Sequence, residues 1–197
     1  LMKAYYAKQD AEKLSGKGDT SQKLTLMKTS ADSLKKSADA LNDSSLWEKK
    51  KIKKKDEKTG EEIEVEDYDW DKITKAVKSF VEDYNDVVKE AGESNTKDVL
   101  RNASWMTGMT DKNSNMLAKI GITIGKGNKL ELDEDALKQA DISSLKTVFT
   151  GYNSFVSKIS QKATGISNAA NRASATYTNN GTYSKTDSSL TSSKIDK

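Results

Sequence analysis

Five carboxylates gathered in the middle of the chain are the side chains most able to do chemistry. Such a cluster could bind a hard cation or supply an acid and a base. Its spacing lacks the EF-hand pattern and no nucleophile accompanies it, so we interpret it as a solvated acidic strand followed by a helix cap. The five residues are Glu64, Glu66, Asp67, Asp69 and Asp71.

A glycine-rich stretch from Gly121 to Lys126 is the second candidate, because it is similar to a phosphate-binding loop. It has three residues between its glycines where that loop has four, and Gly127 stands where a Ser or Thr would hold magnesium. The chain also has no Cys and no His, which excludes catalysis and metal binding by either side chain. We therefore predict that the protein is not an enzyme and needs no cofactor or metal.

The composition restricts the remaining classes of protein. The chain of 197 residues has 33 basic and 30 acidic side chains, and this near balance argues against a nucleic-acid partner. No apolar run approaches the roughly 18 residues of a membrane span, so we expect no membrane partner. Because 34% of the residues are hydrophobic and 32% are charged, the apolar side chains must lie in narrow stripes. Together with the absence of proline, this favours long helices in an elongated bundle.

Three segments repeat apolar residues at alternating spacings of three and four, which keeps one seam of a helix facing its partners. We predict that they form an antiparallel bundle of three long helices. The seams are Leu24, Met27, Ala31, Leu34, Ala38 and Leu41; Ile73, Val77, Phe80, Tyr84, Val87 and Ala91; and Tyr152, Phe155, Ile159, Ala163, Ile166, Ala170, Ala173 and Tyr177. Seams within one chain look like seams between chains, so seven residues are also candidates for partner binding: Leu24, Met27, Leu34, Leu41, Phe155, Ile159 and Ile166.

Residues 47–69 predict a charged β-hairpin, because a lysine run and an acidic run flank a turn at 56–60. The lysines could bind an anionic polymer or surface, but neutralisation by the acidic strand is the interpretation that we favour. Residues 120–132 predict a second, small hairpin around the turn at 125–128. The runs are Lys49, Lys50, Lys51, Lys53, Lys54 and Lys55, and Glu61, Glu62, Glu64, Glu66 and Asp67.

Local signals mark the ends of the helices. Asp19 or Thr20 is expected to cap the first long helix and Asp69 the second, because both are good N-cap types. A shorter helix is expected from about residue 96 to residue 106. An aromatic and methionine cluster at helical spacing is more often core than a binding patch, and we interpret this one as core: Trp105, Met106 and Met109.

Four motifs in a fixed order resemble a known family, the bacterial flagellar filament-cap protein, also called hook-associated protein 2. Residues 76–88 are similar to the family's helix with a Phe-Val-x-x-Tyr-Asn core. Residues 117–137 resemble its short hairpin and following helix, residues 148–149 the approach to its last long helix, and residues 34–41 its N-terminal leg helix. The core motif is supplied here by Phe80, Val81, Tyr84 and Asn85.

The resemblance implies the leg region of that family without its head. In the family, large β-rich head domains lie between the first leg helix and the Phe-Val-x-x-Tyr-Asn helix, whereas here the charged hairpin fills that interval. We expect three parts. Residues 1–19 are a helical segment of a longer chain, residues 20–178 are a single leg-like domain, and residues 179–197 are a disordered polar tail.

The expected fold class is α+β and mostly α: an elongated bundle of three long and several short helices, with the charged hairpin at one end and the small hairpin as a lobe. The resemblance implies an extracellular, structural flagellar protein that leaves the cell through the flagellar export apparatus. Its implied partners are flagellin or hook-associated junction proteins, with self-association as a further expectation. The alternative is a secreted surface adhesin or glycan-binding module, with its site on the charged hairpin or around Trp47 and Trp70.

Overall fold

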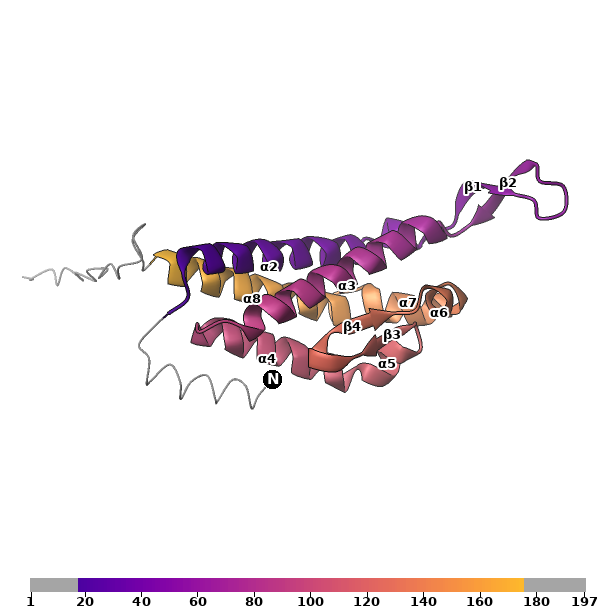
Figure 1. The fold of residues 1–197 in the computed structure, drawn as a ribbon. Coiled ribbons are helices and arrows are strands. Elements are labelled where there is room, and N and C mark those ends of the chain that lie inside the picture. Colours follow the sequence, from indigo (N-terminus) through magenta and orange to yellow (C-terminus); the bar gives the residue numbers. More distant parts are fainter. Residues whose placement is uncertain (1–17, 176–197) are drawn as a thin grey trace, which may run out of the picture.

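The computed structural model describes residues 18–175, and these residues are mostly helical with two small antiparallel hairpins (Figure 1). This confirms the α+β, mostly α class. The predictions for residues 1–17 and for the tail 179–197 lie outside the described residues. In chain order the elements are α2 (Ser21–Leu41), η1 (Ser44–Trp47), β1 (Lys50–Lys55), β2 (Glu62–Asp67), α3 (Trp70–Gly92), α4 (Lys97–Lys112), α5 (Ser114–Ala118), β3 (Ile122–Ile124), η2 (Lys126–Asn128), β4 (Leu130–Leu132), α6 (Glu134–Gln139), α7 (Ile142–Phe149) and α8 (Phe155–Ala175).

The bundle in the described residues has four long helices rather than three (Figure 1). Helix α2 lies between α3 and α8, and α4 closes the remaining side by packing on α8 and α3. Neighbouring helices run in opposite directions: on α2 and α8, Asp39 meets Ser160 and Asp32 meets Ser167. The prediction that this helix ends near Met106 is wrong, because α4 has 16 residues and ends at Lys112.

The predicted seams form the core of this bundle. All six seam residues of α2 and all six of α3 are buried. The seam of α8 is buried from Phe155 to Ala170, but the prediction that it begins at Tyr152 is wrong. Tyr152 is 83% exposed, because the chain turns at Gly151 (φ +98°) and the helix starts only at Phe155. Tyr177 lies outside the described residues.

Aromatic side chains fill the end of the bundle from which the charged hairpin leaves. The Trp47 and Phe149 rings stack with their centroids 5.5 Å apart, and Phe80 packs in a T-shaped arrangement against Phe149 and Phe155, with centroid distances of 6.5 and 6.4 Å. The Trp47 indole N–H donates to the Leu41 carbonyl at 2.8 Å, which satisfies one of the carbonyls left free at the end of α2. The short helix η1 is therefore fixed to the core by Trp47, which is only 1% exposed.

The two candidate caps at the start of α2 have different roles. Thr20 is the N-cap, because its hydroxyl accepts from the Lys23 N–H at 3.2 Å. Asp19 instead lies buried against the start of α4, where its carboxylate accepts from the N–H groups of Asn95 (2.9 Å) and Thr96 (3.0 Å). The carboxylate thus fixes the turn that leads into α4, whose own N-cap residue, Thr96, makes no capping hydrogen bond through its side chain. Asp69 caps α3 as predicted.

The small hairpin β3–β4 packs beside α3 through one asparagine. Asn85 donates to the Leu130 carbonyl (2.9 Å) and accepts from the Leu130 N–H (2.7 Å), so it pairs with β4 as a further strand would. Its neighbour Tyr84 is buried and donates to the Thr110 hydroxyl of α4 at 2.8 Å. The Phe-Val-x-x-Tyr-Asn motif therefore joins α3 to the aromatic core, to α4 and to the hairpin.

Candidate interaction surfaces

In the described part of the chain, no group of three or more potential metal ligands comes together, and the five carboxylates are spread over strand β2 and the start of α3. Glu64 and Glu66 each pair with a lysine across the hairpin, while Asp67 accepts from the Lys54 ammonium at 2.5 Å. That hydrogen bond lowers the pKa of Asp67, and a weaker contribution in the same direction comes from the hydrogen bond that the Tyr68 N–H donates to the carboxylate. Asp69 is the cap of α3. The cluster is therefore an acidic strand and a helix cap, as the sequence indicated.

The glycine-rich stretch also has a structural role. Residues Ile122–Ile124 form strand β3. Gly121 has φ +86°, and a Cβ there would lie 2.7 Å from the Asp133 carbonyl oxygen, so only glycine fits.

None of the helices in the described residues combines the length and the apolar character that a membrane span requires.

The seven candidate partner-binding residues all lie inside the bundle, each no more than 3% exposed. They contact other helices of their own chain in this closed arrangement. A partner could reach them only after α2 and α8 separate. The residues are Leu24, Met27, Leu34, Leu41, Phe155, Ile159 and Ile166.

A polar repeat holds α2 and α8 together at the edge of this core. Lys28 and Ser167 donate to Asp32, and one heptad further along α2 Lys35 and Ser160 donate to Asp39, with distances of 2.5 to 2.7 Å. Burial by itself would raise the pKa of each aspartate, but the hydrogen bonds from lysine and serine outweigh it and lower both. Both aspartates of α2 thus help to close the bundle against α8.

An exposed tryptophan on α4 is the surface feature that sequence reasoning missed. Met106 is buried as expected, but Trp105 is 54% exposed, so interpreting the whole cluster as core was wrong. Its ring lies 4.6 Å from the Lys162 ammonium of α8 and 5.8 Å from the Arg101 guanidinium. A signal was available, because Trp105 falls outside the buried stripe of α4 formed by Val99, Ala103, Met106 and Thr110. Trp105, Arg101, Lys162 and Arg172 are called the Trp105 surface below.

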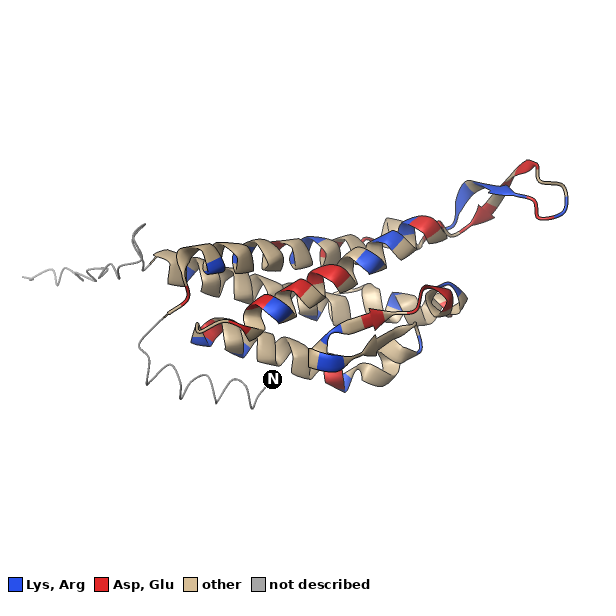
Figure 2. Cartoon of the chain, in the orientation of Figure 1, with Lys and Arg blue, Asp and Glu red and all other residues tan. Residues whose placement is uncertain are grey.

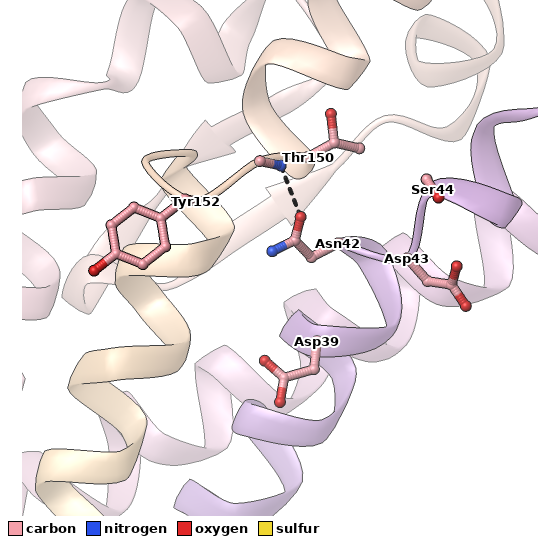
Figure 3. Close-up of a pocket in the computed structure, with 7 residues that line it drawn as sticks. Asp39, Asn42, Asp43, Ser44, Thr150 and Tyr152 are labelled. Atoms are coloured by element: carbon pink, nitrogen blue, oxygen red, sulfur yellow. Dashed lines mark hydrogen bonds between the residues drawn. The ribbon is translucent and has the colours of Figure 1, made fainter.

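A polar hollow of about 480 Å³ lies where α2 ends and the chain turns into α8 (Figure 3). The Asn42 side-chain oxygen accepts from the Gly151 N–H at 2.8 Å and fixes the turn that leaves Tyr152 exposed. Such a mixture of an exposed aromatic ring with carboxylate, amide and hydroxyl groups can hold a hydroxyl-rich ligand. The lining residues are Asp39, Asn42, Asp43, Ser44, Thr150, Gly151 and Tyr152.

The two tryptophans proposed for a glycan site are not available as a pair. Trp47 is buried under Phe149, so it cannot present its ring to a ligand. Trp70 is half-buried and packs edge-on against Tyr68 at 6.2 Å. A glycan site around Trp47 is therefore excluded in this fold, because the core needs the ring.

The charged hairpin projects beyond the bundle, with lysines on one strand and acids on the other (Figure 2). The predicted pairing is confirmed: Lys51 faces Glu66, Lys53 faces Glu64 and Lys55 faces Glu62. The turn is held by Asp56, whose carboxylate accepts from the N–H groups of Lys58 and Thr59. The lysines are therefore partly neutralised by their own hairpin.

Together these features define a helical bundle module whose free polar and aromatic groups lie on its outer surface. Residues 94–197, just over half of the chain, match the family described as flagellar hook-associated protein 2 C-terminus, and the chain belongs to this family. No curated protein and no solved structure was found to match the chain.

Membership confirms the family that the sequence motifs suggested. The family consists of structural flagellar cap proteins that act in filament assembly and form part of the bacterial flagellum. The matched region covers α4 to α8, and therefore contains the Trp105 surface and the small hairpin. Helices α2 and α3 and the charged hairpin precede it.

Proposed function

We propose that this protein is an extracellular, non-enzymatic component of the bacterial flagellum that contacts flagellin or a hook-associated junction protein during filament assembly. The observation that carries the proposal is the family match over residues 94–197. The chain would leave the cell through the flagellar export apparatus.

The Trp105 surface is the contact that we propose for these partners. Tryptophan and arginine dominate the binding energy of protein interfaces, and a large aromatic ring that stays half exposed loses water when a partner covers it. Trp105 lies within the family-matched region, on the outside of the closed bundle. Arg101 and Lys162 lie against the ring, while Arg172 and Arg101 both pair with Asp98. Three basic side chains and one acidic one leave this surface with a positive excess, so the complementary partner surface would carry acidic side chains.

Direct binding tests this assignment. The full chain and its Trp105→Ala variant would be titrated with flagellin and with junction proteins. Tyr152→Ala is the matched control, because its ring is also exposed but belongs to the turn between α7 and α8 and not to α4. Loss of a hot-spot tryptophan costs about 2 kcal/mol or more, which is roughly a thirtyfold weaker Kd. Equal affinity for the wild type and Trp105→Ala would reject the surface.

Export tests the location. The protein would be sought in the culture medium and on purified filaments, with the flagellar export apparatus intact and deleted. Loss from both fractions on deletion is the expected result. Secretion that persists without the apparatus would place the protein outside the flagellar pathway.

A second candidate function, glycan binding, is favoured by the hollow at Tyr152. The ring is 83% exposed beside the carboxylate, amide and hydroxyl groups of Asp39, Asn42 and Ser44. A glycan array with the full chain would find a ligand that is lost in Tyr152→Ala and retained in Trp105→Ala. An array without any such ligand would leave the flagellar contact as the function.

A further inference from the structure

The charged hairpin has two open edges. Strands β1 and β2 form a two-stranded sheet, and the described residues provide no third strand beside either of them. Figure 1 shows the hairpin extending past the end of the bundle, where neither edge is covered. Main-chain N–H and C=O groups along such edges are a template for pairing with another strand. This element is therefore open to strand addition.

The hairpin also has an incompletely covered apolar face. Residues directly opposite each other share a face, so Ile52, Ile63 and Val65 lie together on one side. Ile63 is 40% exposed, and Ile52 and Val65 are only half-buried. A two-stranded hairpin by itself is marginally stable in water, and further strands stabilise it. An added strand would pair with the main-chain N–H and C=O groups along the open edge and would also extend this apolar face.

The charges distinguish the possible strands. Five of the six residues of β1 are lysines, and four of the six residues of β2 are acidic. A β1 edge placed against the β1 edge of another copy would oppose lysine to lysine, and two β2 edges would oppose acid to acid. Like charges directly opposite each other destabilise a sheet, while opposite charges stabilise it. Only β1 against β2 of another copy brings opposite charges together.

We propose that the hairpin joins copies of this chain head to tail, with the acidic strand β2 of one copy adding to the basic edge of β1 in the next. Each lysine strand then lies between two acidic strands, one from its own chain and one from its neighbour. Because the two edges differ, the contact is heterologous, and repeating it gives a ring or an open row of copies. This inference concerns contacts between copies and is independent of binding at the Trp105 surface.

The experiment uses the full chain, with light scattering during size-exclusion chromatography over a range of concentrations. Three charge variants are compared with the wild type. The β1-reversed chain carries Lys51→Glu, Lys53→Glu and Lys55→Glu; the β2-reversed chain carries Glu62→Lys, Glu64→Lys and Glu66→Lys; and the doubly reversed chain carries all six. These positions form the fully charged face of the hairpin.

The expected masses follow from the charges. The wild type and the doubly reversed chain should associate as concentration rises, because on the fully charged face each has three basic residues on one strand and three acidic residues on the other. Each singly reversed chain should stay monomeric alone, because like charges then face each other within its own hairpin as well as between copies. An equimolar mixture of the two should associate, because the acidic strands of one variant can pair with the basic strands of the other. The helical melting transition of the bundle should be the same in all four proteins, because the hairpin projects from it.

Several results would overturn the proposal. A wild type that is monomeric at every concentration has no such contact. Association of either singly reversed chain at the wild-type level would show that strand charge does not direct it. A doubly reversed chain that stays monomeric with its bundle intact would show that the original side chains, and not their complementarity, are needed. Association retained when residues 50–67 are replaced by a short loop would place the contact elsewhere.

Discussion

The bundle and the charged hairpin are stabilised in opposite ways. In the bundle, apolar seams from four helices are buried against each other, and a few polar groups tie the edges together. In the hairpin, lysines face acids across two strands that project from the bundle, and most of the side chains are exposed. Burial of a large apolar side chain contributes roughly 1.5 to 3 kcal/mol, whereas an exposed ion pair contributes about 0 to 1 kcal/mol. The bundle therefore carries the stability, and the hairpin remains available for contacts.

The largest effect is expected from a charge in the centre of the bundle. Ile159 is fully buried, so Ile159→Asp would place a carboxylate without a partner among apolar side chains. We expect loss of the cooperative melting transition, measured by circular dichroism. Gln161→Asp, two residues away on the exposed side of α8, is the matched control and should change little. A variant Ile159→Asp with the wild-type Tm would show that the seam is assigned to the wrong face.

A smaller loss is expected at the buried carboxylate of Asp19, which fixes the turn before α4. Asp19→Ala removes the carboxylate that accepts from the Asn95 N–H and from the Ser94 and Thr96 hydroxyls, at a cost of about 1 to 3 kcal/mol. The loss should appear in urea unfolding, together with faster amide exchange in the first turn of α4. Asp43→Ala removes an exposed helix-capping aspartate and is the comparison. Equal effects of the two substitutions would contradict a special role for the buried carboxylate.

The link between α3 and the small hairpin should break locally. Asn85→Ala removes both hydrogen bonds to Leu130, and we expect a loss of about 1 to 2 kcal/mol in the free energy of unfolding. Exchange of the β4 amides should accelerate while those of α2 do not change. The control is Asp86→Ala, an exposed neighbour on the same helix. Unchanged protection of β4 would mean that packing alone holds the hairpin.

Acid should weaken the α2–α8 edge slightly. The pKa values of Asp32 and Asp39 are lowered in the folded chain, so their stabilisation is present above the ordinary value of 3.8 and is lost as pH falls through the folded values. Both side chains are about half exposed, so solvent screening keeps the effect small. The double variant Asp32→Asn with Asp39→Asn should show a flatter decline of Tm below pH 4. An identical decline in the wild type and the double variant would assign the acid sensitivity to other carboxylates.

The smallest effect on stability is expected in the hairpin. Lys53→Ala removes an exposed side chain whose ammonium nitrogen lies 3.9 Å from a carboxylate oxygen of Glu62. The Tm of the bundle should stay within measurement error, because exposed pairs of this kind contribute little. A fall of several degrees in Tm would mean that the hairpin stabilises the bundle. It would contradict the view that the bundle alone carries the stability.

Much of the fold could be predicted from the sequence because it depends on periodicity. The seams of α2 and α3, the two hairpins and the cap at Asp69 follow from spacing and turn residues that act locally. The start of α8 was misjudged because Tyr152 continues the heptad in phase, although the Gly151 turn keeps it outside the helix. Asp19 was expected at its own helix, and nothing local reveals that its carboxylate reaches across to α4.

The surfaces were harder to predict than the core. Trp47 was considered for binding and is buried, while Trp105 was assigned to the core and is exposed. Tryptophan suits both environments, so residue type alone does not distinguish them. For Trp105, the sequence did contain a signal of exposure, because its position falls outside the apolar stripe of α4 that is buried. For Trp47 the position depends on Phe149, which is distant in sequence and stacks on it only in the folded chain.

The central claim is that partners bind the outside of a closed bundle, and locking the bundle tests it most directly. Asp32 and Ser167 already touch at 2.6 Å between α2 and α8, and the chain has no cysteine of its own. A variant with Asp32→Cys and Ser167→Cys places two thiols at facing positions of these helices, and a non-reducing gel shows the disulfide that joins them on oxidation. We expect the oxidised and reduced forms to bind flagellin or junction proteins equally. Binding lost on oxidation and recovered on reduction would contradict the claim, and would show that the buried seam residues themselves meet the partner.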